Sequence, residues 1–264
     1  MYDFAYQKPT TLAAAVAALG ADPEAKALAG GQTFIPVLKQ RLNKPTVIVD
    51  LSKLGLTGIT VTPTTLTIAG LTTHWDVARS AEAKRAIPGL ADLAAQIGDN
   101  QVRHRGTIGG SLANNDPSAC YPAAVLALGA TITTDRRSIE ADDFFAGMFT
   151  TVLEQGELIT SVAFPIPEKS HYMKFRNPAS RYAMVGVYVA RGPKGVRVAV
   201  TGAGQGGVFR HKEMEAALSA NWSPDAVANI KTPTEDLNSD IHAGAEYRAH
   251  LIAVMAKRAV AAAA

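Results

Sequence analysis

The sequence has almost no cysteine: Cys120 is the only one in 264 residues. A single thiol cannot close an internal disulfide, and it cannot build a four-cysteine zinc or iron–sulfur site within this chain. Any metal redox centre that works with this protein must therefore lie on a partner.

Long hydrophobic runs are absent as well. No uncharged apolar stretch approaches the roughly 20 residues that span a membrane. The first residues, Met1 to Phe4, lack the basic segment and apolar run of a secretory signal, and the alanine-rich end follows Lys257 and Arg258. We expect a soluble cytoplasmic protein with no membrane insertion.

Neither sign of charge dominates the chain. Its 26 basic and 23 acidic residues leave a formal net charge of +3, and the basic residues are scattered along the sequence. This pattern offers no basic face for nucleic acid. The length is enough to bury a sizeable core, and it favours two modest domains.

Several common catalytic motifs are also missing. The sequence contains no Gly-x-x-x-x-Gly-Lys, no His-Glu-x-x-His and no Gly-x-Ser-x-Gly. P-loop, zincin and hydrolase interpretations therefore lose their usual support. We expect no catalytic side chains of the Ser/His/Asp or paired-carboxylate kind, and no metal ligands.

The chain does have two glycine-rich segments about 80 residues apart, residues 29–33 (AGGQT) and 107–111 (TIGGS). Paired glycines allow positive φ and bring backbone N–H groups against an anion, and each segment ends in a hydroxyl. Each segment is interpreted as a cradle for phosphate, and the two together suggest one bound dinucleotide. On the residues alone a purely structural role for either turn stays open.

The first two thirds of the chain show a mixed pattern. Residues 4–50 predict a β-α-β-α-β block, with helices over 12–19 and 34–41 and a strand over 47–49. A hairpin is predicted over 58–69. The remaining expected elements are helices over 75–80, 90–97 and 122–128, a turn at 107–111, strands over 130–133 and 158–164, and an acidic turn at 140–143.

A proline-rich linker at residues 165–170 marks the expected domain boundary, because two prolines in three residues resist both helix and sheet. Beyond it the pattern predicts a small α+β domain with a three-stranded antiparallel sheet. The expected strands are 171–175, 182–190 and 196–200, and the expected helices are 212–220 and 243–261.

Residues 29–36 (AGGQTFIP) and 101–114 (QVRHRGTIGGSLAN) resemble the two FAD-binding signatures of the molybdenum hydroxylase flavoprotein subunits. These are the medium subunits of the carbon monoxide dehydrogenase and xanthine dehydrogenase family. The resemblance runs nearly end to end and includes residues 172–176 (YMKFR) and 181–187 (RYAMVGV). The two glycine signatures at this separation are its most specific part.

The resemblance implies an α+β fold. Residues 1–167 would form a two-lobed FAD-binding domain of the vanillyl-alcohol oxidase and p-cresol methylhydroxylase type, with lobes of about 1–52 and 53–165. Residues 168–264 would form the C-terminal flavoprotein domain. FAD would lie in the cleft between the lobes, clamped by the two glycine segments.

The same resemblance implies a set of cofactor-binding residues. Amides of Gly30 to Thr33 would be the principal phosphate donors, and Asn114 would reach towards the phosphate or ribitol. The full set is Lys26, Ala29, Gly30, Gly31, Gln32, Thr33, Phe34, Ile35, Pro36, Thr107, Ile108, Gly109, Gly110, Ser111, Asn114, Asp116, Ile159, Lys174 and Tyr182.

Some of these positions have simpler interpretations. On the pattern alone Ile159 is better explained as an ordinary core isoleucine. Lys174 fits a solvated lysine on an edge strand equally well, and Tyr182 has the alternative of a half-buried strand tyrosine. Cys120 stands where relatives often carry an acidic residue, and a small buried thiol is expected there. His74 is expected at the start of a helix rather than as an acid or base.

By resemblance, the chain is the FAD-binding electron-transfer subunit of a heterotrimer that can pair into a dimer. A large subunit would carry molybdopterin, a small subunit would carry two [2Fe-2S] clusters, and FAD would pass the electrons to an external acceptor. Two alternatives remain: a self-sufficient flavin oxidoreductase of the same FAD-domain superfamily, and a non-enzymatic interaction module that has lost the cofactor.

Overall fold

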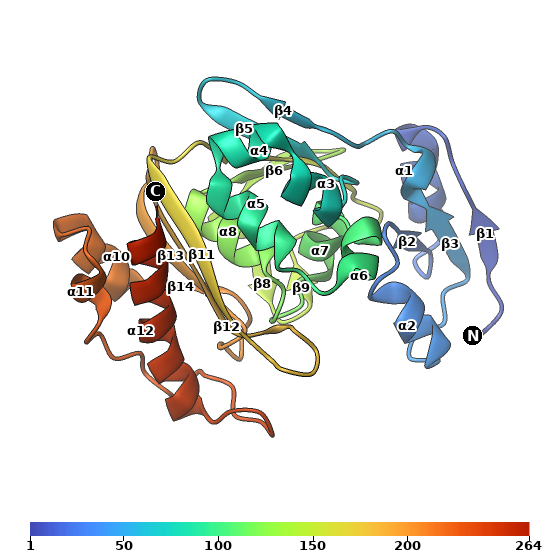
Figure 1. Cartoon of the computed structure of the whole chain (residues 1–264). Coiled ribbons are helices and arrows are strands. Elements are labelled where there is room, and N and C mark those ends of the chain that lie inside the picture. The colour runs from blue at the N-terminus through green and yellow to red at the C-terminus, as the bar shows by residue number, and fades with distance from the viewer. Residues whose placement is uncertain (264) are drawn as a thin grey trace.

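The computed structural model describes residues 1–263 and arranges them in three parts that lie side by side (Figure 1). A small N-terminal unit stands at one end, a central unit of sheet and helices follows, and a C-terminal sheet covered by helices stands at the other end (Figure 1). No helix within residues 1–263 has the length and apolar character needed to cross a membrane.

The N-terminal unit is the predicted β-α-β-α-β block. Its three short strands are parallel in the order β1-β3-β2, so α1 crosses from one edge strand to the other and α2 joins the neighbouring strands β2 and β3. Thr11 caps the first helix by accepting a hydrogen bond from the amide of Ala14. The elements are β1 (Ala5–Gln7), α1 (Leu12–Gly20), β2 (Lys26–Leu28), α2 (Phe34–Lys39), β3 (Val47–Asp50) and the short 3-10 helix η1 (Leu51–Lys53).

The central unit is built on an antiparallel sheet of five strands in the order β4-β5-β10-β6-β7. In β5 buried and half-buried residues alternate, as expected for a strand with one face on the core. The predicted hairpin is β4 paired with β5. The strands are β4 (Ile59–Val61), β5 (Thr65–Ala69), β6 (Thr131–Thr134), β7 (Ser138–Glu140) and β10 (Ile159–Pro165).

Six helices of the central unit lie in the chain between β5 and β6. The most apolar of them, α8, has every residue buried, so it forms the centre of the core. Three of the six were not predicted: α4, α6 and α7. The helices are α3 (His74–Arg79), α4 (Ala81–Ala86), α5 (Pro88–Ala95), α6 (Asn100–Arg105), α7 (Ile108–Asn114) and α8 (Tyr121–Leu128). The predicted acidic turn is the end of β7 and the short helix α9 (Ala141–Phe144), followed by the hairpin β8 (Phe145–Gly147) and β9 (Thr150–Thr151).

The C-terminal sheet has four antiparallel strands, not the predicted three, in the order β11-β12-β13-β14. The additional strand has only two residues and pairs with the end of β13, too short for a sequence pattern to reveal. The strands are β11 (Lys169–Arg176), β12 (Ala183–Gly192), β13 (Gly195–Thr201) and β14 (Phe209–Arg210), and the helices are α10 (Lys212–Ala220), α11 (Pro224–Val227) and α12 (Ala245–Ala262).

This sheet is buried on both faces. Val185, Val187 and Val189 of β12 pack with α10 and α12, whereas the alternate residues Tyr188 and Ala190 join the core of the central unit. Helices therefore cover one face of the sheet and the central unit covers the other (Figure 1). The C-terminal part is fixed to the central unit by shared core.

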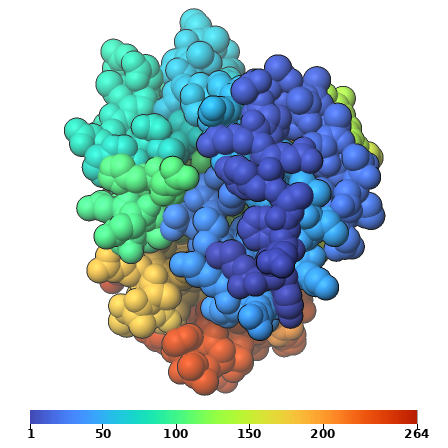
Figure 2. Space-filling model, turned by 90° about the vertical axis from the view of Figure 1, so that its right-hand side faces the viewer, coloured from blue at the N-terminus to red at the C-terminus, as the bar shows by residue number. Residues whose placement is uncertain are grey.

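The N-terminal unit is attached by a smaller core. Leu71 and Leu158 of the central unit pack against Ala15 and Leu19 of α1. The loop before β10 adds polar contacts, because the side-chain amide of Gln155 donates to the carbonyl oxygen of Leu19 at 3.3 Å. Seen from the side, the N-terminal unit covers much of the face, with the central unit beside it and the C-terminal part below (Figure 2).

Candidate functional site

A cavity of about 1050 Å³ lies between the N-terminal unit, the central unit and the loop before β12. Small-molecule sites usually occupy about 300–1,000 Å³, so this cavity suits a large ligand. All but three of the predicted cofactor-binding residues line it. The lining members are Lys26, Ala29, Gly30, Gly31, Gln32, Thr33, Phe34, Thr107, Gly109, Gly110, Ser111, Asn114, Asp116, Ile159, Lys174 and Tyr182.

The three other predicted residues do not line the cavity. Ile108 is fully buried and its side chain belongs to the core of the central unit. Ile35 and Pro36 lie within α2, after the part of the chain that faces the cavity. A position close to a glycine segment in the sequence therefore does not by itself show whether a residue lines the cavity.

The first glycine segment presents free backbone amides. It connects β2 to α2, and Gly31 has a φ of +73°, which is favourable for glycine and strained for other residues. Within residues 1–263, the amides from Gly30 to Thr33 donate to no protein acceptor, whereas the amide of Ile35 already bonds the carbonyl of Gly31 at 3.0 Å. Four successive unpaired N–H groups at the wall of a cavity form a ready site for an anion.

The second glycine segment is different from the prediction. It is no loop with positive φ: Gly109 and Gly110 lie in the first turn of α7, and Thr107 caps that helix by accepting from the amide of Gly110 at 3.1 Å. The amides of Ile108 and Gly109 donate to the carbonyls of Thr72 and Gly70. Since these N–H groups are used within the protein, the segment offers no amide cradle.

Close packing explains the glycines of the second segment. A Cβ on Gly109 would lie 2.6 Å from the carbonyl oxygen of Gly70. The first glycine segment also meets the backbone that leads into the second, because a Cβ on Gly30 would lie 2.0 Å from the carbonyl oxygen of Arg105 and 2.8 Å from Cα of Gly106. Glycine at these positions lets the N-terminal and central units approach closely at the cavity wall.

A cationic group lies in another part of the cavity wall. The ammonium of Lys174 donates to the carbonyl oxygen of Gln96 at 2.8 Å and approaches Sγ of Cys120 at 3.4 Å. An ammonium has three N–H donors, so one stays available for a ligand. Lys174 is half-buried and anchored, not the solvated edge lysine that its place on β11 allowed. Cys120 is buried, as expected for a free thiol.

Two further titratable residues lie near this cation. Burial raises the pKa of the Asp116 carboxyl, although the amide of Ser118 donates to it. Burial and the charge of Asp116 raise the pKa of Tyr182, whose side chain remains half exposed at the cavity. The arrangement offers a ligand one fixed cation, one carboxyl and an aromatic ring within a single region.

The helix α6 forms part of the cavity wall that sequence reasoning missed. Its N-cap is Asp99, which accepts from the amide of Val102 at 2.9 Å, and this capping pattern was the available signal. The guanidinium of Arg103 donates to the carbonyl oxygen of Ile97 at 2.8 Å. The His104 ring stacks on Trp75 with centroids 4.0 Å apart, so His104 links α6 to α3.

His74 is the first residue of α3, as predicted, but it is also buried against the cavity. Burial, with the charge of Arg103, lowers its pKa to about 4, so the imidazole is neutral at physiological pH. Its Nδ1 atom is buried and has no hydrogen-bond partner within residues 1–263. Nothing in its sequence context distinguished it from an ordinary helix-start residue.

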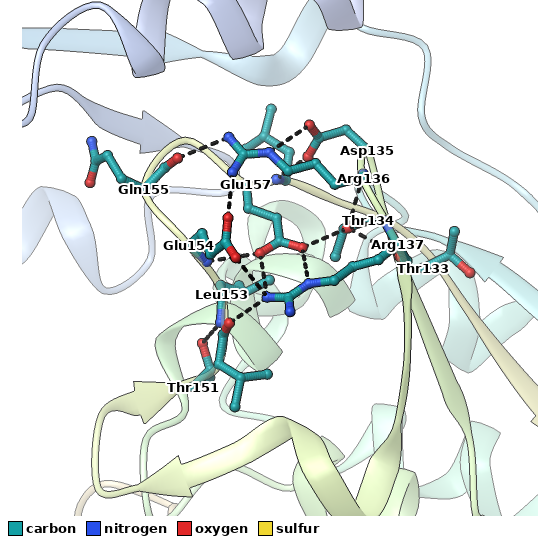
Figure 3. Close-up of polar contacts among 12 residues, drawn as sticks. Thr133, Thr134, Asp135, Arg136, Arg137, Thr151, Leu153, Glu154, Gln155 and Glu157 are labelled. Carbon is teal, nitrogen blue, oxygen red and sulfur yellow. Dashed lines mark hydrogen bonds and ion pairs between the residues drawn. The ribbon is translucent and has the colours of Figure 1, made fainter.

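A buried carboxylate supports the loop that closes the cavity before β10. Arg137 points at Glu157 from the turn between β6 and β7 (Figure 3), and its Nε donates to Glu157 at 2.9 Å. The hydroxyl of Thr134 donates to the same carboxylate at 2.8 Å. These bonds, Arg137 first, lower the pKa of Glu157 to about 2 against the opposing effect of burial.

A third glycine-rich stretch fits a dinucleotide-binding spacing, but the elements around it do not fit that role. Residues 202–207 (GAGQGG) fit the spacing Gly-x-Gly-x-x-Gly. That fingerprint requires a strand before it and a helix after it, whereas here it connects β13 to β14. The loop also lies outside the cavity lining.

The cavity chemistry suits a dinucleotide better than a metal. Within residues 1–263, no group of three or more His, Cys, Asp or Glu side chains could hold a metal ion. In contrast, the free amides at Gly30 to Thr33 and the spare donor of Lys174 are hydrogen-bonding groups that a phosphorylated, heterocyclic ligand could engage.

Comparison with known families gives a match over residues 2–167 to the family described as "FAD binding domain in molybdopterin dehydrogenase". This match spans more than half of the chain and contains both glycine segments. It ends at Pro167, within the proline-rich linker.

Similar curated proteins match the chain over nearly their whole length. The nicotine 6-hydroxylase medium subunit of Paenarthrobacter nicotinovorans is 33% identical, with 97% of this chain and 95% of that protein covered. The carbon monoxide dehydrogenase medium chain of Hydrogenophaga pseudoflava is 31% identical, with 98% and 96% covered.

Solved structures agree with these relatives. The reconstituted CO dehydrogenase from Oligotropha carboxidovorans has a chain that superposes with a TM-score of 0.89 at 30% sequence identity, covering 98% of this chain and 96% of that one. Quinoline 2-oxidoreductase from Pseudomonas putida 86 gives a TM-score of 0.87 at 28% identity, covering 98% and 96%.

Proposed function

Because the chain belongs to the family of FAD-binding domains of molybdopterin dehydrogenases, we propose that it is the FAD-carrying electron-transfer subunit of a molybdenum hydroxylase complex. The observation that carries this proposal is the cavity lined by both glycine segments, with four unpaired amides at one wall. The similarity to medium subunits over nearly the full chain supports it.

The proposal assigns the phosphate-binding part of the cofactor to the first glycine segment. Amides of Gly30 to Thr33 would donate to the diphosphate, and the Thr33 hydroxyl would add a donor. The second segment would act by spacing, since its amides are already bonded, and would offer the side chains of Ser111 and Asn114. Lys174 and Tyr182 would face the flavin ring, and Ile159 would supply apolar contact.

We also propose that the chain divides into two domains. Residues 1–167 would be the FAD-binding domain, in two lobes of about 1–52 and 53–165 of the vanillyl-alcohol oxidase type. Residues 168–264 would be the C-terminal flavoprotein domain. The cavity between the N-terminal and central units supports the two lobes, and the family match over residues 2–167 supports the boundary. The C-terminal domain would complete the site, because residues of β11 and of the loop before β12 also line the cavity.

Bound FAD would supply the redox chemistry by accepting electrons and passing them on, and this chain would position and tune it. Lys174 would place positive charge beside the ring, which favours the reduced, more negative form of a flavin. Cys120, the only thiol, cannot ligate an iron–sulfur cluster by itself, so the [2Fe-2S] clusters and molybdopterin would lie on a small and a large partner subunit. The three chains would form a heterotrimer that can pair.

Reconstitution tests this function. The purified chain, loaded with FAD, is assayed alone and then with a molybdopterin subunit and an iron–sulfur subunit of this family, against carbon monoxide, N-heterocycles and aldehydes with an artificial electron acceptor. The proposal predicts turnover only with all three chains present. Turnover by the FAD-loaded chain alone would favour a self-sufficient flavin oxidoreductase, and absence of FAD binding would favour an interaction module.

A further inference from the structure

His74 is the most conspicuous polar group in the cavity wall that the resemblance to relatives did not assign. Its side chain is 5% exposed and lines the cavity, and neither ring nitrogen bonds another described residue. Nδ1 is closed to solvent and therefore to a ligand, which leaves Nε2, beside Gly106, as the nitrogen that a ligand in the cavity can reach. A ligand that covered Nε2 without bonding it would leave a buried polar atom without a partner, at a cost of roughly 1–3 kcal/mol, so a hydrogen bond between this nitrogen and the ligand is favoured.

The backbone fixes this imidazole against the second glycine segment. The amide of His74 donates to the carbonyl oxygen of Gly106 at 2.9 Å, and the preceding Thr73 forms a β-bridge with Thr107. Thr73 also caps α3 through the amide of Asp76. The His74–Gly106 bond belongs to this β-bridge, so the bridge and the Thr73 cap together set the position of the ring.

Gly106 keeps the space beside the ring open. A Cβ there would lie 2.6 Å from Nε2 of His74 and 2.8 Å from Cδ2. On its other side Gly106 meets the first glycine segment, because a Cβ on Gly30 would lie 2.8 Å from Cα of Gly106. Gly106 thus lies between the imidazole and the first glycine segment with its unpaired amides, where the N-terminal and central units meet.

We propose that His74 is a cofactor-binding residue whose Nε2 donates a hydrogen bond to the dinucleotide held by the first glycine segment. This inference rests on the proposed FAD site and adds a residue to it. A neutral imidazole carries one N–H donor and one acceptor nitrogen, so it can serve a phosphate or ribose oxygen without bringing charge into the wall.

The surroundings of the ring keep it neutral. Arg103 from α6 is the charged group that acts on it, and Tyr121 from α8 packs against it with ring centroids 5.4 Å apart. Both burial and the positive charge of Arg103 oppose protonation. Cofactor affinity should therefore show no titration step between about pH 5.5 and 8 that depends on His74.

The test compares His74→Phe, His74→Gln and the matched control His104→Phe, each measured for FAD affinity and for thermal stability without FAD. His104 lies on the neighbouring helix, outside the cavity lining, and a phenyl ring can keep its stacking on Trp75. His74→Phe should weaken FAD binding about tenfold, and His74→Gln, which keeps an amide donor, should stay within about threefold of the wild type.

Stability separates binding from a structural role. Replacing an unpaired buried polar group by an apolar ring of similar size should leave the melting temperature of the cofactor-free chain unchanged or raised. A merely structural His74 would lower stability and affinity together. The inference is overturned if His74→Phe binds FAD like the wild type, or if wild-type affinity shows a titration between pH 5.5 and 8 that the variant abolishes. If the wild type binds no FAD, the proposed function fails instead.

Discussion

Replacing Gly30 by alanine should push the first glycine segment away from residues 105–106, which lead into the second segment. The added methyl group would lie 2.0 Å from the carbonyl oxygen of Arg105, 2.7 Å from its carbonyl carbon and 2.8 Å from Cα of Gly106. Real Cβ contacts essentially never fall below 3.0 Å, so the segments must move apart by about 1 Å. All three opposing atoms are backbone, which cannot rotate away.

The cost should appear mainly in cofactor affinity. Overpacking usually costs about 1–3 kcal/mol, and rigid backbone neighbours place Gly30→Ala near the upper limit, which corresponds to a roughly 150-fold change in an equilibrium constant. Without FAD the N-terminal unit can shift outward and relieve the strain. Binding across both segments requires them to close again, so FAD affinity should fall by about 100-fold while the cofactor-free melting temperature drops by only a few degrees.

The assay is a titration of the cofactor-free chain with FAD, followed by flavin fluorescence. Gly20→Ala is the matched control, because a Cβ there meets nothing within 4 Å and Gly20 is the last residue of α1. The control should bind FAD like the wild type. If Gly30→Ala binds FAD within threefold of the wild type, the reasoning that the segments are in backbone contact at the cofactor site is wrong.

Three further predictions concern the rest of the cavity. Lys174→Met should weaken FAD binding at least tenfold, because a charged hydrogen bond contributes about 1.5–3 kcal/mol, whereas Lys169→Met on the exposed start of β11 should not, as measured by the same titration. Glu157→Gln should lower the free energy of unfolding at pH 7 by about 2 kcal/mol in urea denaturation, and Glu168→Gln should not. The folded pKa of Glu157 is about 2, below its ordinary 4.5, so its contribution is present above pH 4.5 and is lost as the pH falls towards 2; a difference between variant and wild type that persists undiminished at pH 2 would contradict this. Cys120 should react slowly with a thiol reagent in the folded chain and at least fivefold more slowly with FAD bound, since it is 5% exposed and lines the cavity; equal rates with and without FAD would place the cofactor elsewhere.

Local sequence signals were sufficient for most of the fold. The helix over residues 12–19 and the hairpin over residues 58–69 are specified by short-range chemistry, and the structure confirms both. The proline-rich linker is shorter than the predicted 165–170: only residues 166–168 lie outside strands, because Pro165 ends β10 and Lys169 begins β11. The short elements β14 and α4 were missed because two to six residues carry too little periodicity to detect.

The second glycine segment shows what local signals cannot provide. Two adjacent glycines are poor helix formers, so residues 107–111 were expected to form a turn. The structure places them at a helix start because Thr107 caps that helix and Gly70 and Thr72 accept the first amides. Those acceptors come from a segment almost forty residues earlier, and no local pattern announces them. The Thr107 cap was the one signal that could have been used.

The residues that line the cavity were predictable only in part, for a similar reason. The sequence named residues by their distance from a glycine motif, which included Gly30, a residue of the cavity wall, but also Ile108, whose side chain belongs to the core. His74 was recognised as the start of a helix, yet its burial depends on Gly106 and Tyr121, which are distant in sequence. Burial and unpaired donors are tertiary properties, so they became visible only in the folded chain.

The most direct test of the central claim is the stoichiometry of FAD binding by the purified chain, measured by calorimetric titration together with the visible flavin spectrum. The account predicts one FAD per chain, with a perturbed flavin spectrum and with binding strongly weakened in Gly30→Ala but not in Gly20→Ala. A folded chain that takes up no FAD even at millimolar concentration, or that binds it equally well when Gly30 is replaced, would contradict the account.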